Sequence, residues 1–271
     1  MRAQPFRIGV LCMVLAACSD RRAVPTNPDT SVLLSNVSDP MRGSALFFDG
    51  ADDYVEIPDA SSLDLIDGFT VAAWIYLVEY TEWASVVTKG GLPDDAGNGN
   101  NYTIHQSGPA FPVLESELGH LRFTADGPAL PIPLPESNSV IPLEEWHFIA
   151  VTFDGTTVRF YLDGELDGEQ TVPGALIPND EPLHLGVDFP GGDEYWHGLI
   201  DEVRIWNQPL QLSHIRAAMR GHSSPLASAL VGYWQFDEGS GNIVRDRSGY
   251  RNDGALVGNP LWVSPGAPNQ P

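Results

Sequence analysis

Basic residues are scarce in this sequence. Lysine and arginine together number 14, against 36 aspartates and glutamates, and Lys89 is the only lysine. Binding to nucleic acid or to anionic lipid depends on cationic side chains that contact phosphates, so the composition argues against both as partners. The same composition supplies many carboxylate oxygens, which hard cations such as calcium prefer, although solubility alone is a second interpretation of the acidity.

Cysteine is nearly absent, and the N-terminal apolar run is too short to cross a membrane. The two cysteines are Cys12 and Cys18, so a disulfide framework is not expected. Residues 8–17 form the apolar run and follow the basic residues Arg2 and Arg7. A basic end before a short apolar stretch is typical of an export signal.

The end of this run, Leu15-Ala16-Ala17-Cys18, resembles the lipobox of bacterial lipoproteins. The resemblance implies that residues 1–17 are a signal peptide and that Cys18 is acylated. We therefore expect a protein of the bacterial cell envelope that contacts a membrane through its lipid only. An ordinary export signal cleaved nearby is the alternative.

Helix-forming patterns are few, whereas glycine (27) and proline (23) are abundant. Residues 18–43 are polar and aperiodic, which predicts a disordered tether. Beyond them, about a dozen short strand patterns are separated by turn residues, and LSHIRAAMRG (212–221) predicts one short helix with Ser213 as N-cap and Gly221 as its stop. This pattern predicts an all-β sandwich of two antiparallel sheets with one short helix.

The stretch WHGLIDEVRIW (196–206) raises a question about one carboxylate. Strict alternation along a strand puts Leu199, Val203 and Ile205 on one face together with Asp201. A lone ionised carboxylate on an apolar face costs several kcal/mol unless it is paired or bound to a metal. Lysine is almost missing from the chain, so few cationic side chains can neutralise it.

Four segments identify a family: ALFFDGADDYVEIP, FTVAAWIYL, WHFIAVTFDGTTVRFYLDG and GLIDEVRIWNQPL, in this order. They resemble the laminin-G-like jelly-roll domain of the concanavalin A-like lectin/glucanase superfamily, over about residues 44–221. The resemblance implies a two-sheet jelly-roll sandwich that binds carbohydrate or extracellular protein, often with a calcium ion. We assign residues 44–229 to this domain.

Residues 230–263 (LVGYWQFDEGSG onward) also resemble the family, but in relatives this segment stands before the first strand. Either it begins a second domain that the chain does not complete, or it folds back and supplies a missing hairpin to the same sandwich. We favour the second interpretation, because an incomplete repeat would expose aromatic side chains and a sheet edge to water. Residues 264–271 are predicted to be disordered.

The same resemblance implies a calcium site. The aspartate of the 196–206 strand corresponds to Asp201, and the end of the first strand corresponds to Asp49 and Gly50, with Asp237 or Glu238 completing the shell. The alternative is that Asp201 caps a turn through backbone N–H groups. Calcium takes six to eight oxygen ligands, which this sequence can provide.

Glu165, Asp167 and Glu169 match the ExDxE spacing of the glucanase branch, in which alternate acids flank the sugar bond. Here they follow the Asp163-Gly164 turn and are interrupted by Gly168. We therefore expect no catalysis from them.

A weaker ligand-binding prediction rests on Tyr80, Trp83 and Tyr102, whose rings could stack on sugars. Residues 91–101, rich in Asp and Asn, could hold a second ion or form a loop tip. No P-loop, nucleophile elbow or HExxH motif is present, and no histidine pair has metal-ligand spacing.

These observations predict a lipid-anchored, non-catalytic binding module for carbohydrate or protein, stabilised by calcium. The first alternative is a structural envelope protein without a small ligand, and the second is a glucanase-like glycoside hydrolase.

Overall fold

The computed structural model describes residues 43–90, 99–107, 118–131, 134–222 and 226–268. The chain divides into residues 1–37 and residues 38–271, and all described residues belong to the second part. The predicted signal peptide, Cys18 and nearly all of the predicted tether lie outside the described ranges. Over those ranges, no helix has both the length and the apolarity that crossing a membrane requires.

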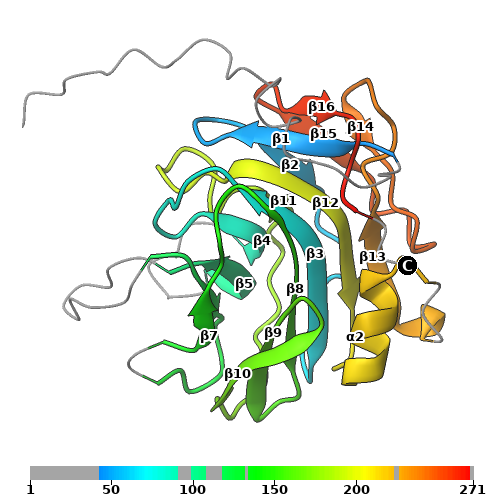
Figure 1. Cartoon of the computed structure of the whole chain (residues 1–271). Helices are drawn as coiled ribbons and strands as arrows, with labels where there is room; N and C mark the ends of the chain where they lie inside the picture. The colour runs from blue at the N-terminus through cyan, green and yellow to red at the C-terminus, as the bar shows by residue number, and fades with distance from the viewer. Residues whose placement is uncertain (1–42, 91–98, 108–117, 132–133, 223–225, 269–271) are drawn as a thin grey trace, which may run out of the picture. The chain divides into compact units, whose positions relative to one another are not determined.

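Two antiparallel sheets of eight strands form the sandwich, which confirms the predicted fold class (Figure 1). Sheet 1 runs β10-β9-β8-β3-β12-β1-β16, with β13 also paired to β12. Its strands are β1 (Ala45–Asp49), β3 (Phe69–Leu77), β8 (Trp146–Phe153), β9 (Thr157–Leu162), β10 (Glu165–Thr171), β12 (His197–Trp206), β13 (Leu230–Trp234) and β16 (Leu261–Val263).

Sheet 2 runs β14-β15-β2-β11-β4-β5-β6-β7. Its strands are β2 (Tyr54–Ile57), β4 (Ser85–Gly90), β5 (Asn100–Gln106), β6 (His120–Thr124), β7 (Glu136–Val140), β11 (Leu183–Leu185), β14 (Ile243–Val244) and β15 (Gly254–Val257).

The main core lies between the sheets, and a smaller apolar cluster covers the outer face of sheet 1. Alternate residues of β3, such as Val71 and Ile75, enter the main core, whereas Ala72 and Trp74 join the second cluster with Ile215 of the helix. Burial on both faces explains why β3 is a continuous apolar run in the sequence. Outside the strands, the described residues hold the helix α2 (Leu212–Met219) and a 3-10 turn, Ala227–Ala229.

The helix was predicted in the right place, but its N-cap was wrong. Gln211 occupies the N-cap position, and Ser213 lies inside the first turn. At the other end, Gly221 has φ +68° and donates its N–H to the Ala218 carbonyl at 3.0 Å, as a glycine stop requires.

Residues 230–263 contribute strands to both sheets. β13 pairs with β12 and β16 pairs with β1 in sheet 1, while β15 pairs with β2 in sheet 2. In Figure 1 the red β16 lies beside the blue β1, and the orange β13 lies beside the yellow β12. Trp234 and Phe236 of this segment are fully buried in the main core.

Candidate functional site

Asp201 lies at a bulge in β12, which corrects the predicted alternation. The pairing of β12 with β3 shifts between Asp201 and Arg204, and Glu202 has φ +54°, a left-handed conformation. Because of the extra residue, Ile200, Val203 and Ile205 all enter the main core. Asp201 therefore does not share a face with Val203 and Ile205, but faces outward beside Trp74.

Both carboxylate oxygens of Asp201 accept backbone hydrogen bonds. Oδ1 accepts the N–H of Glu202 and Oδ2 accepts the N–H of Ala267, each at 2.8 Å. Asp201 is only 3% exposed, and this burial, with the nearby charges of Glu202 and Asp237, raises its pKa well above the ordinary value. Ala267 belongs to residues 264–271, which were predicted to be disordered, yet it is 5% exposed and bound to β12 by this hydrogen bond; residues 269–271 lie outside the described ranges.

Asp237 borders the same cavity as Asp201. Its Oδ1 accepts the N–H of Ser44 at 3.1 Å, which ties the turn after β13 to the start of β1. The cavity has a volume of about 190 Å³. It is lined by Trp74, Asp201, Glu202, Ala218, Met219, Gly221, Tyr233, Gln235, Asp237, Ala267 and Pro268, with no lysine or arginine among them.

The nearest arginine on the same strand is engaged by Glu202 instead. Arg204 pairs with the Glu202 carboxylate, and Tyr233 Oη donates to the same carboxylate at 2.6 Å. Arg204 also donates to the Ala218 carbonyl at 2.6 Å. No arginine bond to Asp201 is found among the described residues, so its charge has only backbone N–H groups to offset it there.

Asp49 and Gly50 belong to a different part of β1. Asp49 pairs with His197, whereas Leu46 pairs with Ile200, so Asp49 lies about four residues, or ~13 Å, along the strand from the level of Asp201. One ion cannot bridge that separation. Gly50 makes the tight turn after β1 with φ +77°, which a larger residue would adopt under strain.

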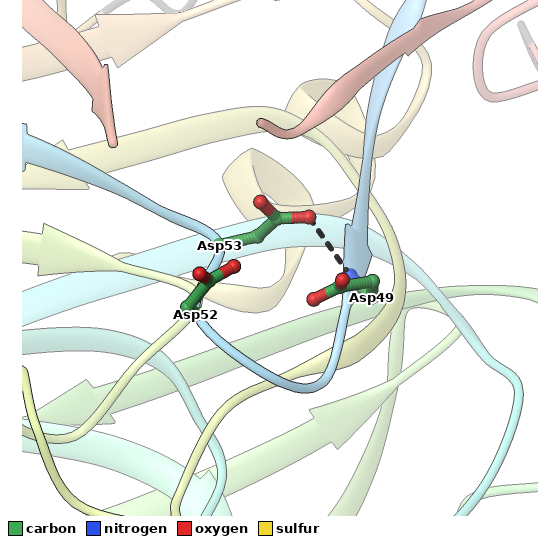
Figure 2. Close-up of side chains that lie close together, drawn as sticks. All are labelled: Asp49, Asp52 and Asp53. Carbon is green, nitrogen blue, oxygen red and sulfur yellow. Dashed lines mark hydrogen bonds between the residues drawn. The ribbon is translucent and has the colours of Figure 1, made fainter. Parts of the chain in front are cut away.

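Asp49 instead forms a cluster with Asp52 and Asp53, in which the ligand oxygens lie within 4.8 Å of one another (Figure 2). Asp53 is buried, and its two oxygens accept the N–H groups of Asp49 at 3.1 Å and Asn259 at 2.6 Å. Burial, with the charges of Asp49 and Asp52, raises the pKa of Asp53 to about 6. Since those hydrogen bonds hold the β1–β2 turn, the cluster has a structural use without an ion.

Glu238 is directed toward two arginines. Its Oε1 accepts the N–H of Arg245 at 3.1 Å and lies 3.8 Å from the Arg247 guanidinium. The structure therefore does not bring Asp49, Gly50, Asp201 and Glu238 together as one metal site. Of the predicted ligands, only Asp201 and the alternative Asp237 face a common space.

The three predicted aromatic residues have different surroundings. Tyr102 is fully buried and stacks on Phe69 in the core, so it cannot contact a ligand. Tyr80 is half-buried and donates its hydroxyl to the Ile141 carbonyl at 2.7 Å. Trp83 is half-buried and stacks on His105, with ring centroids 4.9 Å apart.

The acids of the ExDxE match do not form a catalytic set. Glu165 pairs with Arg216, Glu169 pairs with Arg159, and Asp167 accepts two hydrogen bonds from Ser139. A bulge between Leu166 and Gly168 also interrupts the alternation that such a set needs.

The Asp/Asn-rich segment that suggested an ion site lies mostly outside the described residues, since 91–98 are not among them. Asn101, which is described, is buried and donates to the Leu65 and Ile177 carbonyls. Its role is therefore structural.

Sequence reasoning missed a pair of carboxyl groups on sheet 2. Asp188 Oδ1 accepts hydrogen bonds from Thr88 Oγ1 at 3.0 Å and Ser85 Oγ at 3.3 Å. Glu194 is hydrogen-bonded to Asp188, and burial together with the charge of Asp188 raises the pKa of Glu194 to about 7. The sequence does contain a feature that could have predicted this pair. Pro190-Gly191-Gly192 is a turn sequence, and a reversal of the chain there brings Asp188 and Glu194 close together.

The two antiparallel sheets, packed face to face, have the architecture of a jelly-roll sandwich. Residues 49–216 match the profile of the Laminin_G_3 family of the concanavalin A-like lectin/glucanase superfamily, and the chain belongs to this family.

Among solved structures, the chain is similar to a candidate carbohydrate-binding protein from Bacteroides ovatus. The two are 15% identical with a TM-score of 0.65, over 84% of this chain and 62% of the other. At this identity the likeness shows the fold alone.

Two curated relatives are much larger proteins. SH2 domain-containing protein B of Arabidopsis thaliana is 23% identical over 48% of this chain and 20% of its own length. Adhesion G-protein coupled receptor V1 of Danio rerio is 26% identical over 69% of this chain and 3% of its own length. The chain thus spans only a small part of either relative.

Proposed function

We propose that this protein is a non-catalytic module that binds carbohydrate. Its family belongs to a lectin and glucanase superfamily, and its fold is that of a candidate carbohydrate-binding protein. The non-catalytic assignment rests on Glu165, Asp167 and Glu169, each of which contacts a different side chain. Retaining hydrolysis instead needs two carboxylates about 5–5.5 Å apart on either side of one sugar bond.

Native gels cast with soluble polysaccharides test this proposal. We expect the full-length protein to migrate more slowly in at least one gel, and to release no reducing sugar from the retarding polysaccharide. Unchanged migration in every gel would contradict the binding function, and released sugar would contradict the non-catalytic assignment.

We further propose that calcium binds between Asp201 and Asp237. The donor set fits the ion, since two carboxylates face a cavity without a lining cation and hard cations prefer oxygen ligands. Bound calcium would supply charge neutralisation there, and the two acids would hold it. A calcium-dependent melting temperature, measured against a chelator, tests this proposal.

Finally, we propose that Cys18 carries a lipid that anchors the protein in a bacterial cell envelope. The support is the spacing of basic residues, apolar run and cysteine in residues 2–18. Cells fed labelled palmitate should incorporate label into the wild type but not into the Cys18→Ala variant, which should also leave the membrane fraction. Equal labelling of both proteins would contradict the anchor.

A further inference from the structure

Lys89, the only lysine of the chain, is completely buried near the end of β4. A buried ammonium group costs several kcal/mol unless its charge is paired and its N–H groups are bonded. Oxygen atoms of the described residues surround Nζ and form what we call the Lys89 site. These oxygens are Asp59 Oδ1 at 2.8 Å, Asp64 Oδ1 at 3.2 Å, Asn179 Oδ1 and its carbonyl oxygen each at 3.0 Å, and the Glu181 carbonyl oxygen at 2.5 Å.

The oxygens of the Lys89 site come from two loops that are far apart in the sequence. Asp59 and Asp64 lie between β2 and β3, whereas Asn179 and Glu181 lie between β10 and β11. The Asn179 side chain is held in place, because its Nδ2 donates to the Lys89 carbonyl at 3.4 Å and its Oδ1 accepts the N–H of Glu181 at 3.2 Å. One positive charge therefore links both loops to β4.

The donor set around Nζ matches that of a calcium ion. Calcium in proteins takes six to eight oxygens from Asp carboxylates, Asn side chains, backbone carbonyls and water, at 2.3–2.6 Å. The protein oxygens around Nζ are all of these kinds, and a contraction of up to about 0.6 Å would bring them into this range. An ammonium group has only three N–H donors, so it cannot give each of these five oxygens a separate hydrogen bond.

The charges of the Lys89 site also suit a doubly charged ion. Lys89 is the cationic partner of both Asp59 and Asp64, so the site has two carboxylates and one ammonium group. Its formal charge is therefore about −1, whereas a calcium ion with the same two carboxylates would leave it neutral. The Asp64 side chain is only 19% exposed, so water screens the excess negative charge incompletely.

We propose that the Lys89 site is a divalent-cation site in which the chain's own ammonium group replaces the ion. In the wild type Nζ fills the site, so the two loops are held without a metal ion there. Removal of the ammonium group converts the same oxygens into a calcium site. The proposal is independent of the calcium proposed between Asp201 and Asp237, which border a different cavity.

Calcium counted by equilibrium dialysis of the full-length protein tests this proposal. Lys89→Ala removes the ammonium group and leaves space for an ion and water. We expect this variant to bind one calcium ion per chain more than the wild type, with a dissociation constant of about 10⁻⁴–10⁻³ M, as in extracellular calcium modules. Because the difference between two proteins is counted, an ion bound at Asp201 in both of them does not affect the result.

The matched control is Lys89→Met, which also loses the charge but fills the space of the lysine side chain with an unbranched apolar one. It should bind no more calcium than the wild type. A second variant combines Lys89→Ala with Asp64→Asn, which keeps a side-chain oxygen and removes one carboxylate charge. This double variant should bind the additional ion about tenfold or more weakly than Lys89→Ala alone.

Folding of Lys89→Ala in calcium but not in chelator would support the proposal, because the ion would then replace the ammonium group between the loops. The proposal is wrong if Lys89→Ala binds no more calcium than the wild type, or stays unfolded at every calcium concentration. Equal additional binding by Lys89→Met would place the ion elsewhere and contradict it. An additional ion whose affinity is unchanged by Asp64→Asn would contradict it as well.

Discussion

At the scale of single residues, the position of Asp201 depends on one inserted residue in β12. The bulge at Glu202 turns Asp201 away from the main core, and two backbone N–H groups then bind its carboxylate. Those two bonds match the turn-capping alternative, but they leave the charge of Asp201 beside that of Asp237. A cation in the shared cavity would relieve this repulsion.

The residue-scale prediction concerns calcium. At calcium a hundred times its dissociation constant, we expect the melting temperature of the wild type to rise by about 5 to 10 °C relative to chelator. Asp201→Asn should lose this response. In Asp201→Asn the side-chain NH2 group would face one of the two backbone N–H donors, which by itself lowers the melting temperature. The measurement is therefore the difference in melting temperature between calcium and chelator.

The control is Asp52→Asn, which alters an exposed member of the acidic cluster in Figure 2 and should keep the full calcium response. If Asp52→Asn abolishes the shift and Asp201→Asn retains it, the ion binds at the β1–β2 turn instead.

At the scale of elements, helix α2 is held by its buried face more than by its N-terminal cap. Ile215 and Ala218 join the cluster on sheet 1, and Arg216 donates to the Gly164 carbonyl at 2.9 Å. The N-cap residue, Gln211, makes no side-chain capping bond. Tertiary contacts therefore stabilise this short helix, as is usual for helices of this length.

The element-scale prediction compares two substitutions in α2. Ser213→Ala should change the free energy of unfolding by no more than ~0.5 kcal/mol, whereas loss of a real N-cap costs ~1 kcal/mol. Ile215→Ala should cost about 2 to 5 kcal/mol, because it empties a buried site. Chemical denaturation measures both, and a larger loss for Ser213→Ala than for Ile215→Ala would contradict this account.

At the scale of the whole molecule, the two ends of the described fold are bound to each other. β16 pairs with β1, and the Ser44 N–H binds Asp237. The segment after Ala229 thus completes both sheets and contributes Trp234 to the main core. Its removal would uncover the β12 edge, the β1 edge and the core at once.

We therefore expect a chain truncated after Ala229 to lose cooperative thermal unfolding, because the lost burial exceeds the ~5–15 kcal/mol that stabilises a typical domain. Truncation after Pro268 keeps every paired strand and should melt like the full chain. Calorimetry on both compares them directly, and a normal melt for the shorter protein would mean that residues 230–268 form no part of the sandwich's cooperative unit.

Local pattern was sufficient for most of the strands. The apolar run FTVAAWIYL forms the strand β3, and the predicted turn at Asp163-Gly164 is present with both residues at positive φ. These features depend on neighbouring residues only. Ser213 was predicted as the N-cap because serine has a stronger capping propensity than glutamine. The helix begins earlier, at Leu212, so that Ile215 and Ala218 lie on its buried face.

Residue types and their spacing along the chain were sufficient to predict the fold class, the strand pattern, the acidic character and the family. Which acidic side chains lie close together depends on the tertiary structure. A bulge displaced Asp201, the register of β1 carried Asp49 away from it, and a chain reversal joined Asp188 to Glu194. Such convergence depends on pairing between distant strands, and a shift of one residue changes which face a side chain occupies.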